Sequence, residues 1–442
     1  MQQRATQLTI TTQGRLEMFP KPSSFRRRIR IRRFLIAVLV LCLLDAIHTV
    51  ARLPGEPKRP ESPNLIRKDS TQSVFIASIH QDSAPRLHAT WSTAVVDLVT
   101  RLGADNAFFS AADLGSSDGT RNELLQLKRR LDKLAVANSV VFGKTALDLQ
   151  DDADEQPTDG ERRPGWVRDG RKRKHYLRKV PLRAEARNRA LAPLKALAEQ
   201  GRVFQTILWI DDDIVFGPQD VLDLIDTRGG NYSAACAADI GAYPHLQSIS
   251  ALRDDAGRHP VSKHWPWFRS PPSRSAAEMR EPVPLSSCWN GLTVFDAAPF
   301  YTNSPPKFRA VEDSLADFHV EAPETCLIHV DNAPASKGVW MNPNVRVAHS
   351  AGTYARLQDN QFPDWVSAVV GSWNNRIERW RAPAASAELD AKLRARVSEW
   401  VSSGEGASEQ RSEAGVQCLV DDMEVIKPRG PKWWLFITQQ PG

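Results

Sequence analysis

The five cysteines of this chain include no Cys-x-x-Cys spacing, so a structural zinc site is not expected. No internal repeat is evident, and 442 residues suffice for one large catalytic domain or two smaller ones. The net charge is +6, but residues 1–33 hold nine Lys and Arg against Glu17 alone, so the remainder is nearly neutral. Because nucleic-acid proteins carry their basic surface on the folded domain, we predict no nucleic-acid partner.

One long apolar run stands near the N-terminus. Residues 34–44 are uncharged and apolar, and residues 45–50 extend the run with a single acid, Asp45. The run is short for a membrane span, which needs about 20 residues, and a secretory signal peptide is the alternative. However, six arginines directly precede the run, and no clear small-x-small cleavage site follows. We predict a cytosolic basic tail at 1–33, a single-pass type II signal anchor at 34–50 and a lumenal C-terminal domain.

The cysteines beyond the anchor would face an oxidising lumen, where disulfides persist. Cys42 lies within the anchor itself. Four cysteines allow three full pairings, and the sequence does not choose among them. One N-glycosylation acceptor, Asn231-Tyr-Ser233, is present, although the motif alone does not decide its use. The four lumenal cysteines are Cys236, Cys288, Cys326 and Cys418.

The order of elements predicts the fold class. Residues 51–72 are rich in Pro and charge without apolar periodicity, which indicates a stem. From Ser73 to Phe142, three strand-like apolar runs alternate with helical patterns. Such alternation is typical of βαβ units, so we predict an α/β domain with a mostly parallel central sheet over residues 73–380. Residues 381–442 are predicted to form a C-terminal extension that packs on this domain.

Three consecutive carboxylates interrupt an apolar run. Within Thr206–Phe216, Asp211, Asp212 and Asp213 follow an apolar stretch, and apolar residues resume directly afterwards. A strand buried on both faces would place these acids at its carboxyl end, where open α/β sheets bind ligands. Carboxylate oxygens gathered there suit Mg²⁺ or Mn²⁺ carrying a diphosphate. An exposed acidic loop is the alternative.

Several other segments have less decisive patterns. The basic run Arg171–Lys179 is predicted as a solvated loop, with contact to a negatively charged ligand as the alternative. Thr325–Val330 and Asn344–Ala348 are predicted as short strands, and His329 is expected in the core. The apolar stretch Lys432–Ile437 is expected to pack on the domain.

Eight short segments between Ser73 and Asp331 match one known family in consistent order. They are Ser73–Ala77, Gly115–Thr120, Arg187–Leu191, Trp209–Asp220, Ala234–Asp239, Leu252–Asp254, Pro284–Phe300 and Cys326–Asp331. In these segments the chain resembles the fungal capsule-associated α-1,3-mannosyltransferases, glycosyltransferase family 69. The resemblance implies a GT-A-like nucleotide-sugar-binding fold, GDP-mannose as donor, Mn²⁺ or Mg²⁺, and a mannoside acceptor. It also implies an α-1,3 linkage formed with retention at the anomeric carbon.

Carried over residue by residue, the resemblance assigns roles to several acids. Asp213 matches the family's acid before an Ile/Val-Val-Phe segment, and Asp211 stands where the family usually has an apolar residue. The triplet is therefore closer to a standard DxD motif than in its relatives, and we predict Asp211 and Asp213 as metal ligands. Asp212 is expected only to shape the turn. Asp118 matches a loop acid near the nucleotide, whereas His80–Ser83 departs from the family's Asn/Glu-rich loop.

Five further residues become site candidates through the resemblance. Arg187 and Asn188 are expected to contact the donor phosphate, with an ordinary solvated helix face as the alternative. Arg253 and Asp254 would by spacing alone form a loop ion pair, but the matching segment makes them catalytic candidates. Glu324 is a candidate contact for the acceptor hydroxyl, with solvation as the alternative.

His349 and Trp289 each carry two interpretations. GT-A enzymes commonly take a last metal ligand from a late histidine, and His349 stands at the end of a predicted strand. A structural histidine is the other interpretation. Trp289 could form a wall against a sugar, or it could belong to the core.

Together these expectations describe a Golgi type II membrane protein that transfers mannose from GDP-mannose to a mannoside. Two alternatives stay open. The same fold could use another nucleotide-sugar donor, or the protein could be a non-catalytic, membrane-anchored glycan-assembly protein that binds glycan or partner enzymes. The intact acidic triplet favours catalysis. In either case the protein could form a complex with other glycosyltransferases.

Overall fold

The structure, a computed structural model, contains two compact units, Met1–Arg52 and Leu53–Gly442, and each is described by itself. In the first unit, helix α1 (Ser23–Ala51) contains the stretch Arg30–Ala51, which is apolar and long enough to cross a membrane. Such a helix is consistent with the predicted anchor at 34–50 and also with a signal sequence. The structure describes residues 23–53, 55, 72–158, 161–169, 174–332, 337–359, 362–381, 383–403, 411–426 and 434–438. Most of the predicted tail and stem lies outside these residues.

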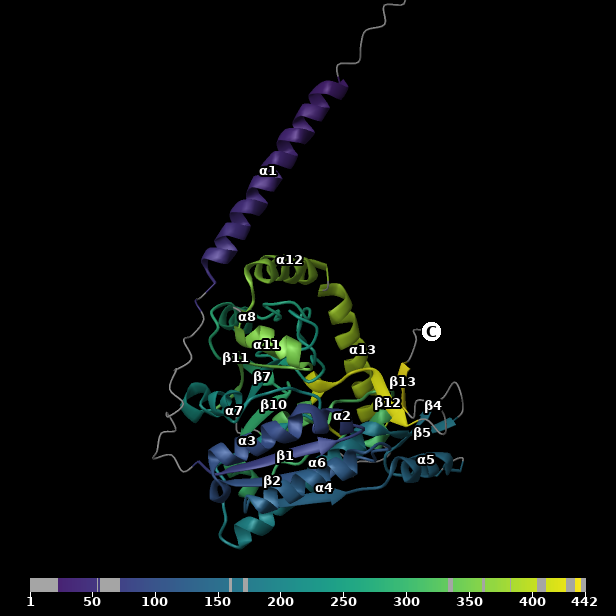
Figure 1. Cartoon of the computed structure of the whole chain (residues 1–442). Helices are drawn as coiled ribbons and strands as arrows, with labels where there is room; N and C mark the ends of the chain where they lie inside the picture. Colours follow the sequence, from purple (N-terminus) through teal and green to yellow (C-terminus); the bar gives the residue numbers. More distant parts are fainter. Residues whose placement is uncertain are drawn as a thin grey trace, which may run out of the picture. The chain divides into compact units, whose positions relative to one another are not determined.

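A nine-stranded mixed sheet forms the centre of the second unit (Figure 1). Its strands stand in the order β3 (Ala137–Phe142), β2 (Ala107–Asp113), β1 (Val74–His80), β6 (Thr206–Ile210), β10 (Leu292–Asp296), β7 (Ala234–Ile240), β11 (Val339–Ala348), β9 (Val283–Ser287) and β8 (Arg253–Asp254). The four strands from β3 to β6 are parallel, and β7 is parallel to β11. β10 runs antiparallel between β6 and β7, and β9 and β8 pair antiparallel at the edge. The predicted α/β class is confirmed.

Helices cover both faces of the parallel half of the sheet. α6 (Lys179–Glu199) packs on one face, whereas α3 (Ser92–Leu102), α4 (Thr120–Lys133) and α7 (Pro218–Ile225) pack on the other. Alternate residues of β1 and β6 therefore enter two separate cores, which explains why both strands are largely apolar. The remaining helices are α2 (Ala84–Arg86), α5 (Ala146–Asp154), α8 (Pro271–Glu278), α9 (Asp313–Ala316), α10 (Glu324–Asp331), α11 (Ala351–Asp359), α12 (Trp365–Arg381) and α13 (Pro383–Ser402).

A second, antiparallel sheet corrects one expectation. Its order is β13 (Trp434–Thr438), β12 (Asp422–Ile426), β5 (Lys174–Arg178) and β4 (Trp166–Asp169). The described part of the basic run Arg171–Lys179, expected as a solvated loop, forms β5 and the start of α6, and Arg178 is fully buried. Its guanidinium is compensated by Glu321 at 2.7 Å and Asp313 at 2.6 Å. These acids lie 143 and 135 residues away, so no local pattern could reveal the pairing.

A disulfide and strand pairing attach the C-terminal part to the rest of the second unit. Cys326 in α10 is bonded to Cys418, and β12 pairs with β5. The other disulfide joins Cys236 to Cys288. The structure thus selects one of the three pairings that the sequence left open. The side chains of the stretch Lys432–Ile437 lie outside those that the structure describes.

The segment Thr325–Val330 is helical, so its prediction as a strand is wrong. It belongs to α10, which begins directly after Pro323. A short apolar run that is buried all round looks alike in a strand and a helix, and periodicity alone does not separate them. The prediction for Asn344–Ala348 is confirmed, because these residues form the second half of β11.

His329 of α10 is buried, as expected for a core residue. Its Nε2 donates a hydrogen bond to the carbonyl of Cys288 at 2.8 Å, and its ring stacks on Phe295 with centroids 5.3 Å apart. Burial lowers the pKa of His329 to about 4, against the opposing effect of this hydrogen bond. An unfolded histidine titrates near pH 6.5. Between these two values the unfolded chain binds a proton that the folded protein does not, so folding stability falls as the pH drops.

We expect His329→Phe to flatten this part of the pH dependence. Phenylalanine keeps the stacking surface but takes up no proton, so the loss of unfolding free energy between about pH 7 and pH 4 should shrink by about 1–3 kcal/mol. Urea unfolding of the parent and the variant at both pH values measures the change. His88→Phe, at a histidine that is 76% exposed, is the control and should keep the parent's profile. An unchanged slope in His329→Phe would contradict the assignment.

Candidate active site

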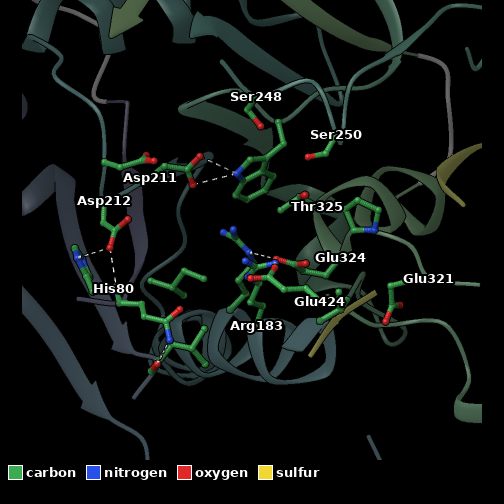
Figure 2. A pocket seen from close by; sticks show the side chains of 18 of the residues that line it. His80, Arg183, Asp211, Asp212, Ser248, Ser250, Glu321, Glu324, Thr325 and Glu424 are labelled. Atoms are coloured by element: carbon green, nitrogen blue, oxygen red, sulfur yellow. Dashed lines mark hydrogen bonds and ion pairs between the residues drawn. The ribbon is translucent and has the colours of Figure 1, made fainter. Parts of the chain in front are cut away.

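A cavity of about 560 Å³ lies at the carboxyl ends of β1 and β6 (Figure 2). Its walls come from the loop after β1, from α6, from the start of α10 and from β12. The acidic triplet borders it, so the triplet lies at the edge of the sheet where the sequence predicted it. The volume falls within the range of about 300–1,000 Å³ that is usual for ligand pockets. Because its walls come from distant parts of the chain, the cavity forms only in the folded domain.

Asp211 is turned toward Trp289. The indole Nε1 of Trp289 lies 3.1 Å from both carboxylate oxygens of Asp211 and donates a hydrogen bond to them (Figure 2). Loss of hydration raises the pKa of Asp211 to about 7, with the charge of Arg187 opposing and that of Asp213 adding to the shift. Trp289 is 4% exposed, as in the core interpretation, and it also lines the cavity, so its contact with a sugar stays a prediction.

Asp212 points the other way, toward the loop after β1. Its carboxylate accepts a hydrogen bond from the backbone N–H of Gln81 at 3.1 Å (Figure 2). It also lies 3.9 Å from Nδ1 of His80. Burial, together with the nearby Arg86, lowers the pKa of His80 to about 3, so this imidazole is neutral and the contact is no ion pair. The carboxylate therefore connects two strand ends, as expected for a residue that shapes the turn.

Asp213 faces His349, which follows the end of β11. Nδ1 of His349 lies 3.4 Å from the Asp213 carboxylate, and its Nε2 lies 2.9 Å from the carboxylate of Asp239 in β7. Burial disfavours the imidazolium, but the hydrogen bond that it donates to the Asp239 carboxylate and the charges of the surrounding carboxylates outweigh burial, so the pKa of His349 is raised. Asp239 is a site residue that the sequence reasoning missed. It ends a segment that matches the family, but nothing in its spacing indicated contact with His349.

The donor set at this edge is suited to a hard divalent cation. Asp213 offers carboxylate oxygens beside the imidazole of His349, and the carboxylate of Asp239 orients that ring. Among the residues that the structure describes, no three or more His, Cys, Asp or Glu side chains form a ready metal site. The carboxylate of Asp211 accepts a hydrogen bond from Trp289, so in this structure it is turned away from Asp213 and His349. These residues therefore fit Mn²⁺ or Mg²⁺ provided that further ligands come from a diphosphate and water.

Arg187 places an incompletely paired cation in the cavity wall. The residue is 6% exposed, and its Nε donates to the Glu324 carboxylate at 3.0 Å. The guanidinium carbon lies 4.2 Å from the ring centre of Trp289 and 5.6 Å from that of Phe308. Its Nη1 is buried and finds no hydrogen-bond partner among the described residues. A buried donor left unpaired is costly, and an anionic ligand would satisfy it.

Besides His349, four predicted site residues do not line the cavity. The Asn188 amide donates a hydrogen bond to the carbonyl of Phe308 at 2.8 Å and accepts one from its N–H at 3.0 Å. Asp118 accepts from the backbone N–H of Thr120 at the start of α4 and from that of Ala84. The other two serve turns: Arg253 donates to four backbone carbonyls, and Asp254 accepts from three backbone N–H groups. In this structure all four side chains stabilise loops and termini around the site.

The cavity wall formed by α6 and β12 contains two charged residues that the sequence reasoning missed, Arg183 and Glu424. Lys179 and Arg183 in α6 pair with Glu424 of β12, at 2.8 and 2.7 Å. Glu424 lies 245 residues beyond Lys179, so no sequence signal could have joined them. Figure 2 shows Arg183, Glu324 and Glu424 gathered on one side of the cavity.

The profile of one protein family, described as Cryptococcal mannosyltransferase 1, matches residues 73–331, which is more than half of the chain. The chain belongs to this family. The resemblance carried by the eight short segments is thereby confirmed, and with it the GT-A-like α/β fold class that it implied. Membership of the Cryptococcal mannosyltransferase 1 family supports the predicted enzyme class, a glycosyltransferase. No curated protein is significantly similar to this sequence.

Two solved structures are similar to this member of the Cryptococcal mannosyltransferase 1 family. The mannosyltransferase PcManGT from Pyrobaculum calidifontis, solved with GDP-Man and Mn²⁺, is 10% identical and has a TM-score of 0.34, with 84% of this chain and 85% of that chain covered. Residues 1–349 of TarS from S. aureus are 9% identical with a TM-score of 0.35, and the match covers 75% of this chain and 80% of that one. At such scores these likenesses carry no argument about activity.

The Arg187–Glu324 pair yields a stability prediction. Arg187→Met leaves Glu324 buried without its partner and should lower the free energy of unfolding by about 3–5 kcal/mol. The double variant Arg187→Met/Glu324→Leu removes both charges and should recover most of that loss. Urea unfolding measures all three proteins, and Arg189→Met is the matched control at an exposed arginine of the same helix. If the double variant were as unstable as Arg187→Met, the loss would not come from the unpaired carboxylate.

Proposed function

We propose that this protein transfers mannose from GDP-mannose to a mannoside acceptor, forming an α-1,3 linkage with retention. The observation that carries the proposal is the unpaired Nη1 of buried Arg187 in the wall of the cavity that Asp213 also lines, with Nδ1 of His349 3.4 Å from the Asp213 carboxylate. One group offers a donor for a phosphate oxygen and the other a place for a cation. Membership of a mannosyltransferase family supports the choice of sugar.

The metal would be held by Asp213 and His349, with Asp239 orienting the imidazole. Asp211, the other carboxylate of the DxD motif, would join them as a ligand if its hydrogen bond to Trp289 were exchanged for the metal. A bound Mn²⁺ or Mg²⁺ supplies charge stabilisation for the departing diphosphate. Arg187 stabilises the same negative charge from the opposite wall, because Glu324 and the rings of Trp289 and Phe308 fix its guanidinium.

Retention places both partners of the reaction on one side of the sugar. An α-linked donor that yields an α-linked product receives the acceptor hydroxyl on the face from which GDP departs. The diphosphate and the acceptor must therefore share this cavity, and held together there they react with little further loss of freedom. Glu324, at the start of α10, is the carboxylate that we assign to the acceptor side.

For its location we propose the Golgi membrane. In this arrangement α1 is retained as a type II anchor and the second unit is lumenal. The pairing of all four cysteines beyond α1 into disulfides supports an oxidising compartment.

The decisive test is release of GDP from GDP-mannose by the full chain with Mn²⁺, in the presence and absence of mannosides. We expect release that increases with a mannoside acceptor. Equal turnover of UDP-sugars would favour a different donor. No release from any nucleotide sugar would favour the non-catalytic glycan-assembly protein over an enzyme.

A second test addresses the metal assignment. Asp213→Asn should lower GDP release about 100-fold or more, the scale on which the loss of one preorganised electrostatic contact acts. Asp105→Asn, at an exposed acid outside the cavity, is the matched control and should retain parent activity. Parent-like transfer by Asp213→Asn would remove this residue from the metal site.

A further inference from the structure

Helix α12 has its amphipathic pattern reversed. The residues that it buries against the domain are small or polar, namely Ala368, Gly371, Ser372 and Asn375. A Cβ on Gly371 would lie 2.2 Å from the backbone carbonyl oxygen of Trp265, so this face requires the close approach that glycine allows. A surface helix normally buries its large apolar side chains and exposes polar ones. The reversed pattern indicates that the apolar outer face of α12 contacts another surface outside the domain.

The outer face of α12 is a broad apolar stripe. Trp365 is 65% exposed and Trp380 is 72% exposed, although they stand at opposite ends of the helix. At 100° per residue, the large apolar side chains fall within one sector of about 140°, opposite the buried face. The members of this stripe are Trp365, Val366, Val369, Val370, Trp373, Ile377 and Trp380.

Basic residues accompany the stripe. Arg376 lies in the same sector with its guanidinium 5.2 Å from the ring centre of Trp373, and Arg381 borders the sector in the last turn. Glu378 is the only acid within the helix. Tryptophan combined with arginine around an apolar face is the composition of helices that lie in the interface of a bilayer, where the rings sit at headgroup level.

The connection between α1 and β1 is short enough to hold the domain near a membrane in which α1 is anchored. Only residues 52–73 separate α1 from β1, and this length spans at most about 80 Å even when fully extended. A retained anchor in α1 would therefore limit how far the start of β1 can move from the membrane. A soluble partner protein would explain an apolar patch, but it would not require the arginines beside it.

We propose that the apolar stripe of α12 is a membrane-docking surface that lies in the headgroup region of the bilayer in which α1 is anchored. Docking would give the domain a second attachment and a defined orientation at the membrane. The proposal requires that α1 is retained as an anchor. It does not depend on the sugar that is transferred.

A nitroxide label on Val370→Cys in the full chain tests the proposal. The background is Cys42→Ser, so that the other four cysteines remain in their disulfides. The protein is reconstituted in phosphatidylcholine vesicles, with or without a minor fraction of phosphatidylserine. Collisions of the label with lipid-soluble oxygen and with a water-soluble nickel chelate are then compared. Leu147→Cys in α5, where the side chain is 69% exposed, is the matched control.

We expect oxygen collisions to rise and nickel collisions to fall at position 370, more strongly with phosphatidylserine, whereas position 147 keeps a water-exposed signature. Replacing Trp365 and Trp380 by serine should return position 370 to the signature of position 147 while GDP release stays at the parent level. A water-exposed signature at position 370 in the parent would overturn the proposal. Spin–spin broadening between labels of different chains would also overturn it, because a second copy would then cover the face. Loss of GDP release without a change at position 370 would bear on the proposed activity alone.

Discussion

The buried ion pair between Arg187 and Glu324 is the contact on which the architecture of the cavity depends. It joins α6, which covers one face of the sheet, to the start of α10. It also holds the guanidinium on the ring of Trp289, whose indole nitrogen in turn holds Asp211. A buried pair is weak evidence for stability, since an apolar pair often serves as well. Its consequence here is that Nη1 of Arg187 stays without a hydrogen-bond partner among the described residues and can bind an anionic ligand.

The C-terminal part supplies the charges that balance the start of α6. Glu424 pairs with Lys179 and Arg183, while Glu321, beside the strand bridge to Val420, pairs with Arg178. Each of these basic groups thereby has an acidic partner, as burial requires. The groups left for a ligand include the buried Nη1 of Arg187 in the cavity wall and the carboxylate of Asp213, which lies beside His349. This division of charge fits a diphosphate held between a cation and a guanidinium.

Local patterns were sufficient for much of the fold and for part of the site. The strands around the acidic triplet and the helices between them were predictable, because apolar periodicity is read over a few residues. His349 was predicted from its place at a strand end, and the structure sets it against Asp213. The prediction of a strand at Thr325–Val330 was wrong because a short, fully buried apolar run has the same pattern in a strand and in a helix. The prediction of a solvated loop for the basic run Arg171–Lys179 was wrong because the acids that pair with Arg178 are remote in sequence.

By itself the sequence determined the family, the α/β class, the apolar N-terminal helix and the presence of three acids at a strand end. Each of these is contained in the order of neighbouring residues. Only the tertiary structure decided the disulfide pairing, the direction in which each carboxylate of the triplet points, and the partner of each buried charge. It also revealed that α12 faces its apolar side outward. These properties depend on side chains far apart in the chain, which come into contact only when the elements pack.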